Sequence, residues 1–186
     1  MSARSPDLRI NEERFRARFE ALAGIGATPD GGVDRPAFSE AHLKARRWFL
    51  ATAEQAGLEP AVDGAGNHST TLRCGPPGAP TLLLGSHLDS VPNGGRFDGA
   101  LGVLAALEAV QTVKEHGLAL NMHLEAIDFT DEEGHYANFV GSLGLTGRLD
   151  QAHFRASRGG RERFEDALRR AGLRKDALFT AGREPA

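Results

Sequence analysis

The stretch from residue 81 to residue 134 constrains the fold more than any other part of the sequence. It holds two short apolar runs, TLLL and LEAIDF, separated by an apolar segment of helical length. His87 and Asp89 follow the first run, and Glu132 and Glu133 follow the second. A strand–helix–strand order predicts a parallel or mixed sheet with helices on its faces. In such sheets ligands bind just beyond the strand ends, so these side chains indicate a site there.

The rest of the chain extends this α/β pattern. Asn11 and Ser39 each precede an amphipathic segment and have the side chains preferred at helix N-caps. Gly57 is a stop signal for the second of these helices. We therefore predict one domain of class α/β over residues 1–186, with a mixed, mostly parallel sheet flanked by helices. The other expected elements are strands at 58–63, 68–73 and 121–129, helices at 11–23 and 161–171, and a short helix within 135–147.

The overall composition narrows the classes of partner. The chain has 186 residues, a formal net charge of −3 and one cysteine. This charge does not favour nucleic acid or an anionic membrane as a partner. A lone cysteine forms no internal disulfide, and the N-terminus lacks the apolar segment of a signal peptide. Glu108 interrupts the longest apolar helix, which argues against a membrane span. We expect a cytoplasmic protein that acts on a small molecule.

Imidazole and carboxylate groups together are typical ligands of divalent metals, often zinc. His87 and Asp89 are two residues apart, so in an extended segment they point the same way, and Asp89 can hold His87 by a hydrogen bond. By itself, His-x-Asp is also an ordinary polar loop after a strand. Asp98 lies in the glycine-rich NGGRFDG segment. It is a candidate metal ligand and also a candidate cap of the following helix.

Glu132 and Glu133 allow two interpretations. Adjacent acids after a strand are often simple surface charge. Alternatively, one carboxylate binds metal while its neighbour stays off the metal and takes a proton from water. Their position after a buried-type strand favours the second interpretation. Arg96 and His135 are further candidates for contacting a substrate, although Arg96 could instead pair with an acid.

Taken together, GSHLDSVPNGGRFDGALGVLAALEAV and EAIDFTDEEG resemble the metal-binding core of the M20-type metallohydrolases. The chain is most similar to the hydantoinase/carbamoylase group, which includes N-carbamoyl-L-amino-acid hydrolases, β-ureidopropionases and allantoate amidohydrolases. The upstream segment GGVDRPAFSEAHLKARRWFLATAEQAGLE is also similar to this group. The resemblance implies the N-terminal half of a zinc-aminopeptidase-like catalytic domain, and hydrolysis of linear amide or ureido C–N bonds.

The resemblance also implies a role for each motif residue. His87 binds one metal ion, Asp98 bridges two ions and Glu133 binds the second ion. Glu132 is the general base, and Asp89 is the partner of His87. The implied cofactors are two divalent ions, with Zn²⁺ first and Mn²⁺, Co²⁺ or Ni²⁺ as alternatives. A cis peptide bond between Asp98 and Gly99 is also implied.

The chain is much shorter than members of this group. The resemblance implies that further histidine ligands, a lid and dimerisation domain, and groups that grip the substrate belong to parts absent here, and that the site is incomplete. We therefore expect a fragment that is inactive alone, from relatives that are homodimers. Two alternatives stay open: a non-catalytic remnant or associating half-domain, and an M20 dipeptidase or aminoacylase with another substrate.

Overall fold

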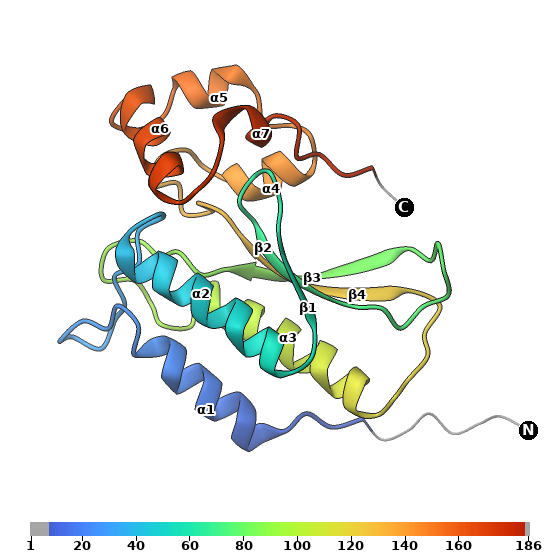
Figure 1. Ribbon diagram of the computed structural model, residues 1–186. Helices are drawn as coiled ribbons and strands as arrows, with labels where there is room; N and C mark the ends of the chain where they lie inside the picture. The colour runs from blue at the N-terminus through green and yellow to red at the C-terminus, as the bar shows by residue number, and fades with distance from the viewer. Residues whose placement is uncertain (1–7, 185–186) are drawn as a thin grey trace, which may run out of the picture.

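The computed structural model describes residues 8–184. Residues 1–7, part of the segment on which the signal-peptide expectation rests, lie outside the described range. Within it, Figure 1 shows a small sheet with helices beside it and a second group of helices at one end. The elements are α1 Glu12–Ala23, α2 Glu40–Gln55, β1 Glu59–Val62, β2 His68–Leu72, β3 Thr81–His87, α3 Ala100–Glu115, β4 His123–Phe129, α4 Val140–Leu145, α5 Gln151–Arg155, α6 Arg161–Arg170 and α7 Lys175–Leu178.

The four strands form one mixed sheet in the order β1-β2-β4-β3. Strands β3 and β4 are parallel and are connected through α3, as the strand–helix–strand pattern predicts. The pairs β1–β2 and β2–β4 are antiparallel, so among the described residues only β3–β4 is parallel. The sheet is mixed, as predicted, but the expectation that it is mostly parallel is wrong, because β1 and β2 form a hairpin that pairs antiparallel with β4. The register places His87 beside Phe129, and both strands therefore end at the same edge of the sheet.

The main hydrophobic core lies between the sheet and the first three helices. Phe19 of α1, Phe49 of α2 and Leu107 of α3 pack with Leu124 and Ala126, which are on one face of β4. These two residues are two positions apart on β4, so their side chains lie on the same face of the sheet. The core thereby anchors the two strands whose ends carry the candidate site.

A second core joins α4 and the helices that follow it to the loop after β4. Phe154, Phe164 and Leu178 are buried in this cluster together with Tyr136. The short helices α5 and α7 were not predicted, because five and four residues are too few to show a helical period. The expected helix at 161–171 is α6, and the expected short helix after Gly134 is α4.

Two helices begin at the N-cap residues that the sequence predicts. Asn11 accepts a hydrogen bond from the backbone of Arg14, and Ser39 accepts one from the backbone of His42. Both predicted N-caps are therefore confirmed. No helix among residues 8–184 is long and apolar enough to cross a membrane.

Candidate metal centre

His87 is the last residue of β3, and its ring orientation is defined by the chain that follows. Its Nδ1 lies 3.0 Å from the main-chain oxygen of Asp89. A carbonyl oxygen only accepts, so Nδ1 carries the proton and donates it. The Nε2 atom is then left with a lone pair for a metal ion.

Two carboxylates face this Nε2 atom. It is 3.7 Å from Oδ1 of Asp98 and 3.9 Å from Oε1 of Glu133. One ligand atom from each of the three residues lies within 4.8 Å of the other two. These separations are too long for hydrogen bonds. They are close to the spacing of roughly 3.3 Å expected between two ligand atoms of a tetrahedral zinc ion, so the donor set fits a divalent metal.

Asp98 reaches this cluster from the loop before α3, and its side chain is 68% exposed. Helix α3 has no side-chain cap, so the interpretation of Asp98 as an N-cap is wrong. Gly99 occupies the cap position with φ +64°, a conformation that favours glycine. A Cβ atom on Gly99 would lie 2.6 Å from Nδ1 of His87, so only glycine allows this close approach.

The peptide bond between Asp98 and Gly99 is trans, as are all peptide bonds between residues 8 and 184. The cis bond implied by the resemblance is therefore not found. In this structure the positive φ of Gly99 turns the chain into α3 without a cis bond.

Asp89 has a different contact from the one that its spacing predicts. Its nearest carboxylate oxygen is 3.6 Å from Nδ1 of His87, so the imidazole donates its hydrogen bond to the main-chain oxygen of Asp89 instead. The fully buried carboxylate accepts hydrogen bonds from the backbone N–H groups of Glu133, at 3.1 Å, and Glu132, at 3.4 Å. Asp89 therefore connects the end of β3 to the acidic pair after β4.

The two adjacent glutamates have separate surroundings. Glu133 faces His87, whereas the carboxylate of Glu132 accepts from the backbone N–H of Ser142 at 2.9 Å and from its hydroxyl at 3.0 Å. Burial raises the pKa of Glu132, and the two hydrogen bonds from Ser142 oppose that rise. Ser142 is a residue that the sequence analysis missed, because it is ten positions from Glu132 along the chain.

Asp131 supports the loop and does not join the metal-ligand cluster. It has φ +51°, and its carboxylate accepts hydrogen bonds from the backbone N–H groups of His135, Tyr136 and Ala137. Burial raises its pKa to about 7, although these hydrogen bonds favour the ionised form. The Asp-Glu-Glu run thus contains one carboxylate that organises backbone, one that accepts from Ser142 and one that faces His87.

A buried ion pair lies next to the site. Asp128 accepts from Nε of Arg46 at 2.8 Å and from the backbone N–H of Leu88 at 2.7 Å. Burial raises the pKa of Asp128, and the guanidinium of Arg46 opposes the rise. Asp128 falls on the same face of β4 as Leu124 and Ala126, and this alternation was the available signal for its burial.

The two further candidates for substrate contact have other partners. The guanidinium of Arg96 lies over the rings of Phe97 and Phe19, at 5.1 and 5.8 Å from their centroids. His135 has its Nε2 atom 2.6 Å from Nη2 of Arg163. Burial, and then the charge of Arg163, lower the pKa of His135.

Comparison with known proteins connects this geometry to a family. Residues 83–179, more than half of the chain, match the sequence family described as Peptidase family M20/M25/M40. The chain belongs to this family. The matched range includes the whole His87, Asp98 and Glu133 cluster.

Within the M20 family, the chain is similar to amidohydrolases. It is 39% identical over 178 residues to the N-carbamoyl-L-amino acid amidohydrolase of Geobacillus stearothermophilus, a match that covers 95% of this chain and 44% of the relative. It is 37% identical over 131 residues to the allantoate amidohydrolase of Bacillus subtilis, covering 69% of this chain and 32% of the relative. The chain therefore spans less than half the length of these relatives.

A solved structure extends the similarity to the fold. The hydantoinase/carbamoylase family amidase from Burkholderia ambifaria superposes with a TM-score of 0.85 at 35% identity, covering 96% of this chain and 44% of that one. The resemblance to the carbamoylase group of the M20 family is thereby confirmed. The chain has the fold of the corresponding part of such an amidase.

Proposed function

We propose that the chain is part of a metal-dependent amidohydrolase that cleaves linear amide or ureido C–N bonds, such as those of N-carbamoyl-L-amino acids or allantoate. The observation that carries the proposal is the convergence of His87, Asp98 and Glu133. It is supported by the amidohydrolase names of relatives with 37–39% identity.

The proposed metal ligands follow from the donor atoms. His87 would hold one divalent ion through Nε2, Glu133 would hold a second, and Asp98 would be shared between them. Zn²⁺ fits an imidazole and carboxylate set best, and Mn²⁺, Co²⁺ or Ni²⁺ are alternatives. When bound, such ions polarise a carbonyl group and lower the pKa of water.

Glu132 is the proposed general base. Glu132 precedes the proposed ligand Glu133 in sequence, and its carboxylate accepts from Ser142 and is not among the three groups of the metal-ligand cluster. It would take a proton from the attacking water as the oxygen bonds to the carbonyl carbon. The same proton would then pass to the leaving nitrogen as the C–N bond breaks.

Residues 1–186 are proposed to form part of an M20 catalytic domain. The groups that grip the substrate and the dimer contacts of the proposed enzyme would lie outside this chain. Arg96 and His135 already contact other side chains, so neither carries the proposal for substrate binding.

A chimera tests the proposed reaction directly. Residues 8–184 would replace the matched part of the Geobacillus stearothermophilus relative, and release of ammonia from N-carbamoyl-L-amino acids would be measured with Zn²⁺, Mn²⁺ or Co²⁺. We expect metal-dependent release that falls by at least about 100-fold in the Glu132→Gln chimera. A folded, metal-loaded chimera without turnover, or one unaffected by Glu132→Gln, would contradict the proposal.

A further inference from the structure

Glu132 and Glu133 are adjacent in sequence, but different groups hold their carboxylates. Oε1 of Glu133 is 3.9 Å from the metal-facing nitrogen of His87. Both oxygens of Glu132 accept from Ser142, one from the backbone N–H and the other from the hydroxyl. Because carboxylates readily bind divalent ions, a free Glu132 beside the same site would compete to become a ligand.

The backbone of the pair does not by itself separate the two roles. The carboxylate of Asp89 accepts from the N–H groups of both residues, which holds the two peptide units in place. This contact leaves both side chains free to rotate. What distinguishes Glu132 is therefore the contact that its carboxylate makes with Ser142.

Ser142 is in turn held firmly against the end of β4. The preceding residue, Gly141, donates its N–H to the carbonyl of Thr130 at 2.7 Å. Asn67 binds both segments, donating to the carbonyl of Gly141 at 3.1 Å and accepting from the N–H of Thr130 at 3.0 Å. A Cβ atom on Gly141 would overlap Asn67 and Thr130, so this close docking requires glycine.

We propose that Ser142 is a positioning residue that keeps the carboxylate of Glu132 out of the metal coordination sphere. This inference rests on the proposed function, since it assumes a metal ion held by His87, Asp98 and Glu133. Ser142 would thereby assign the two adjacent acids to separate tasks, with Glu133 as ligand and Glu132 as base. Loss of the Ser142 hydroxyl would remove one of the two hydrogen bonds that restrain Glu132 and let its carboxylate turn toward the ion more easily.

The test is Co²⁺ binding to the full chain, because the visible absorption of Co²⁺ depends on its coordination number and ligands. Spectra and dissociation constants would be compared for the wild-type chain, Ser142→Ala, Ser142→Thr and Glu132→Gln. Thr146→Ala is the matched control, because Thr146 is the C-cap residue of α4 and its hydroxyl donates only to main-chain carbonyls.

We expect Ser142→Ala to change the spectrum and to bind Co²⁺ about fivefold more tightly, since one hydrogen bond no longer restrains Glu132. Ser142→Thr, Thr146→Ala and Glu132→Gln should retain the wild-type spectrum. A double Ser142→Ala, Glu132→Gln variant should also return to the wild-type spectrum.

Two results would overturn the inference while leaving the proposed metal centre intact. One is a folded Ser142→Ala chain with the wild-type spectrum and affinity. The other is a changed spectrum in Glu132→Gln, which would make Glu132 a ligand already and does not depend on how Ser142→Ala folds. Absence of Co²⁺ binding by the wild-type chain would instead contradict the metal centre itself, and with it this inference.

Discussion

At the residue scale, acidic side chains near the site bind backbone as often as they face the metal-ligand cluster. Asp89 accepts from two N–H groups and Asp131 from three residues, whereas Asp98 and Glu133 face His87. Buried carboxylates are costly unless they accept hydrogen bonds or pair with a cation. The loop after β4 is therefore held by two buried acids: Asp89 fixes the backbone of Glu132 and Glu133, and Asp131 fixes the residues that follow them.

The ion pair of Arg46 and Asp128 gives the first prediction. Both side chains are buried, and Arg46 also donates to the carbonyl of Gly66 and the hydroxyl of Thr130. Arg46→Ala leaves Asp128 without a cation and should lower the free energy of unfolding by about 3–5 kcal/mol in urea denaturation.

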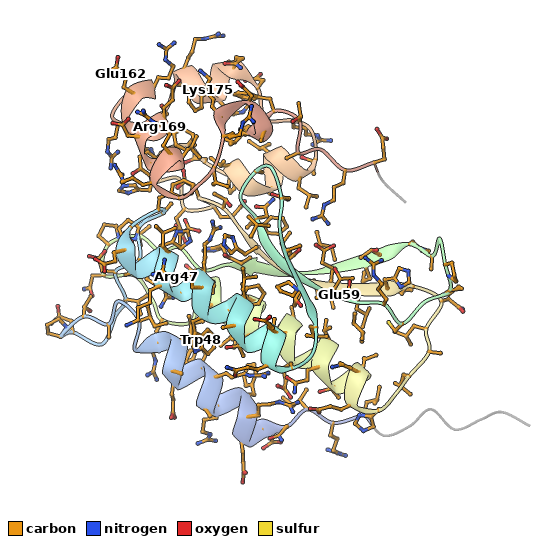
Figure 2. All side chains as sticks on the ribbon, in the orientation of Figure 1. Arg47, Trp48, Glu59, Glu162, Arg169 and Lys175 are labelled. Atoms are coloured by element: carbon orange, nitrogen blue, oxygen red, sulfur yellow. The ribbon has the colours of Figure 1, made fainter. Side chains whose placement is uncertain are left out.

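The neighbouring residue provides the control. Arg47, labelled on α2 in Figure 2, is exposed to solvent. Arg47→Ala should change the free energy of unfolding by less than about 0.5 kcal/mol. Equal effects of Arg46→Ala and Arg47→Ala would show that the buried pair does not stabilise the fold.

His68 gives a prediction for pH. Burial, and then the charge of Arg46, lower its pKa to about 3 in the folded chain. The unfolded chain binds a proton near pH 6.5, so the folded state loses stability as pH falls from about 6.5 toward 3. At pH 5 this loss from His68 is at most about 2 kcal/mol.

The variant His68→Gln should reduce the difference in melting temperature between pH 7 and pH 5. His42 is fully buried with a pKa lowered in the same direction, so part of the pH dependence should remain. His153→Gln, on α5 with a 41% exposed side chain, is the comparison and should change the wild-type difference less than His68→Gln does. A wild-type pH dependence in His68→Gln would rule out the proposed contribution.

At the element scale, the sequence predicted the parts of the fold that local patterns determine. Helices α1, α2 and α3 and all four strands were expected close to their observed positions, because capping residues, turns and apolar periods are local signals. The same signals predicted that His87, Asp98 and Glu133 lie at one edge of the sheet, and their side chains do converge. The contacts of Arg46 and Asp89 were missed because each joins segments far apart in sequence, and the contact of Ser142 was missed because it depends on how α4 packs against the loop after β4.

Strand β3 gives a prediction at this scale. It is last in the strand order, pairs only with β4, and contains the sequence TLLLGSH without proline or a charged Lys or Glu. Leu82 within it is 45% exposed. Such edge strands promote association between chains, and lysine is a common protection.

Leu82→Lys should therefore reduce aggregation of the purified chain, measured by light scattering during concentration. The matched variant Leu8→Lys removes a leucine with 42% exposure that lies outside the sheet, and it should have little effect. Equal scattering by wild-type and Leu82→Lys chains would show that the edge of β3 is not responsible for association.

At the scale of the whole molecule, a groove lies beside strands β3 and β4, and the chain matches less than half the length of its relatives. A groove of about 830 Å³ is lined by Thr81 and Leu83 of β3, by Glu125 of β4 and by Arg183 near the C-terminus. Arg183 crosses to Glu125 with a 2.7 Å ion pair. The chain matches 44% of the length of these two amidase relatives. The groove is therefore a surface of the part of the fold that the chain shares with them.

The ligand count predicts weak catalysis by the chain alone. Residues 8–184 supply His87, Asp98 and Glu133 to the cluster, which gives each of two ions only two protein ligands when Asp98 is shared. Catalytic zinc sites generally use three protein ligands and water. Ammonia release from N-carbamoyl amino acids or allantoate by the purified chain with Zn²⁺, Mn²⁺ or Co²⁺ should thus be near background. Rapid turnover that disappears in Glu132→Gln would show that this chain completes an active site.

Calorimetric titration of the chain with Zn²⁺ tests most directly whether His87, Asp98 and Glu133 form a divalent-metal centre. The wild-type chain should bind Zn²⁺, and His87→Ala should bind at least about tenfold more weakly, because the imidazole Nε2 is lost from the cluster. His116→Ala removes a histidine at the far end of α3 and should bind as the wild-type chain does. Absence of Zn²⁺ binding, or equal affinity of wild-type and His87→Ala chains, would contradict the proposed metal centre.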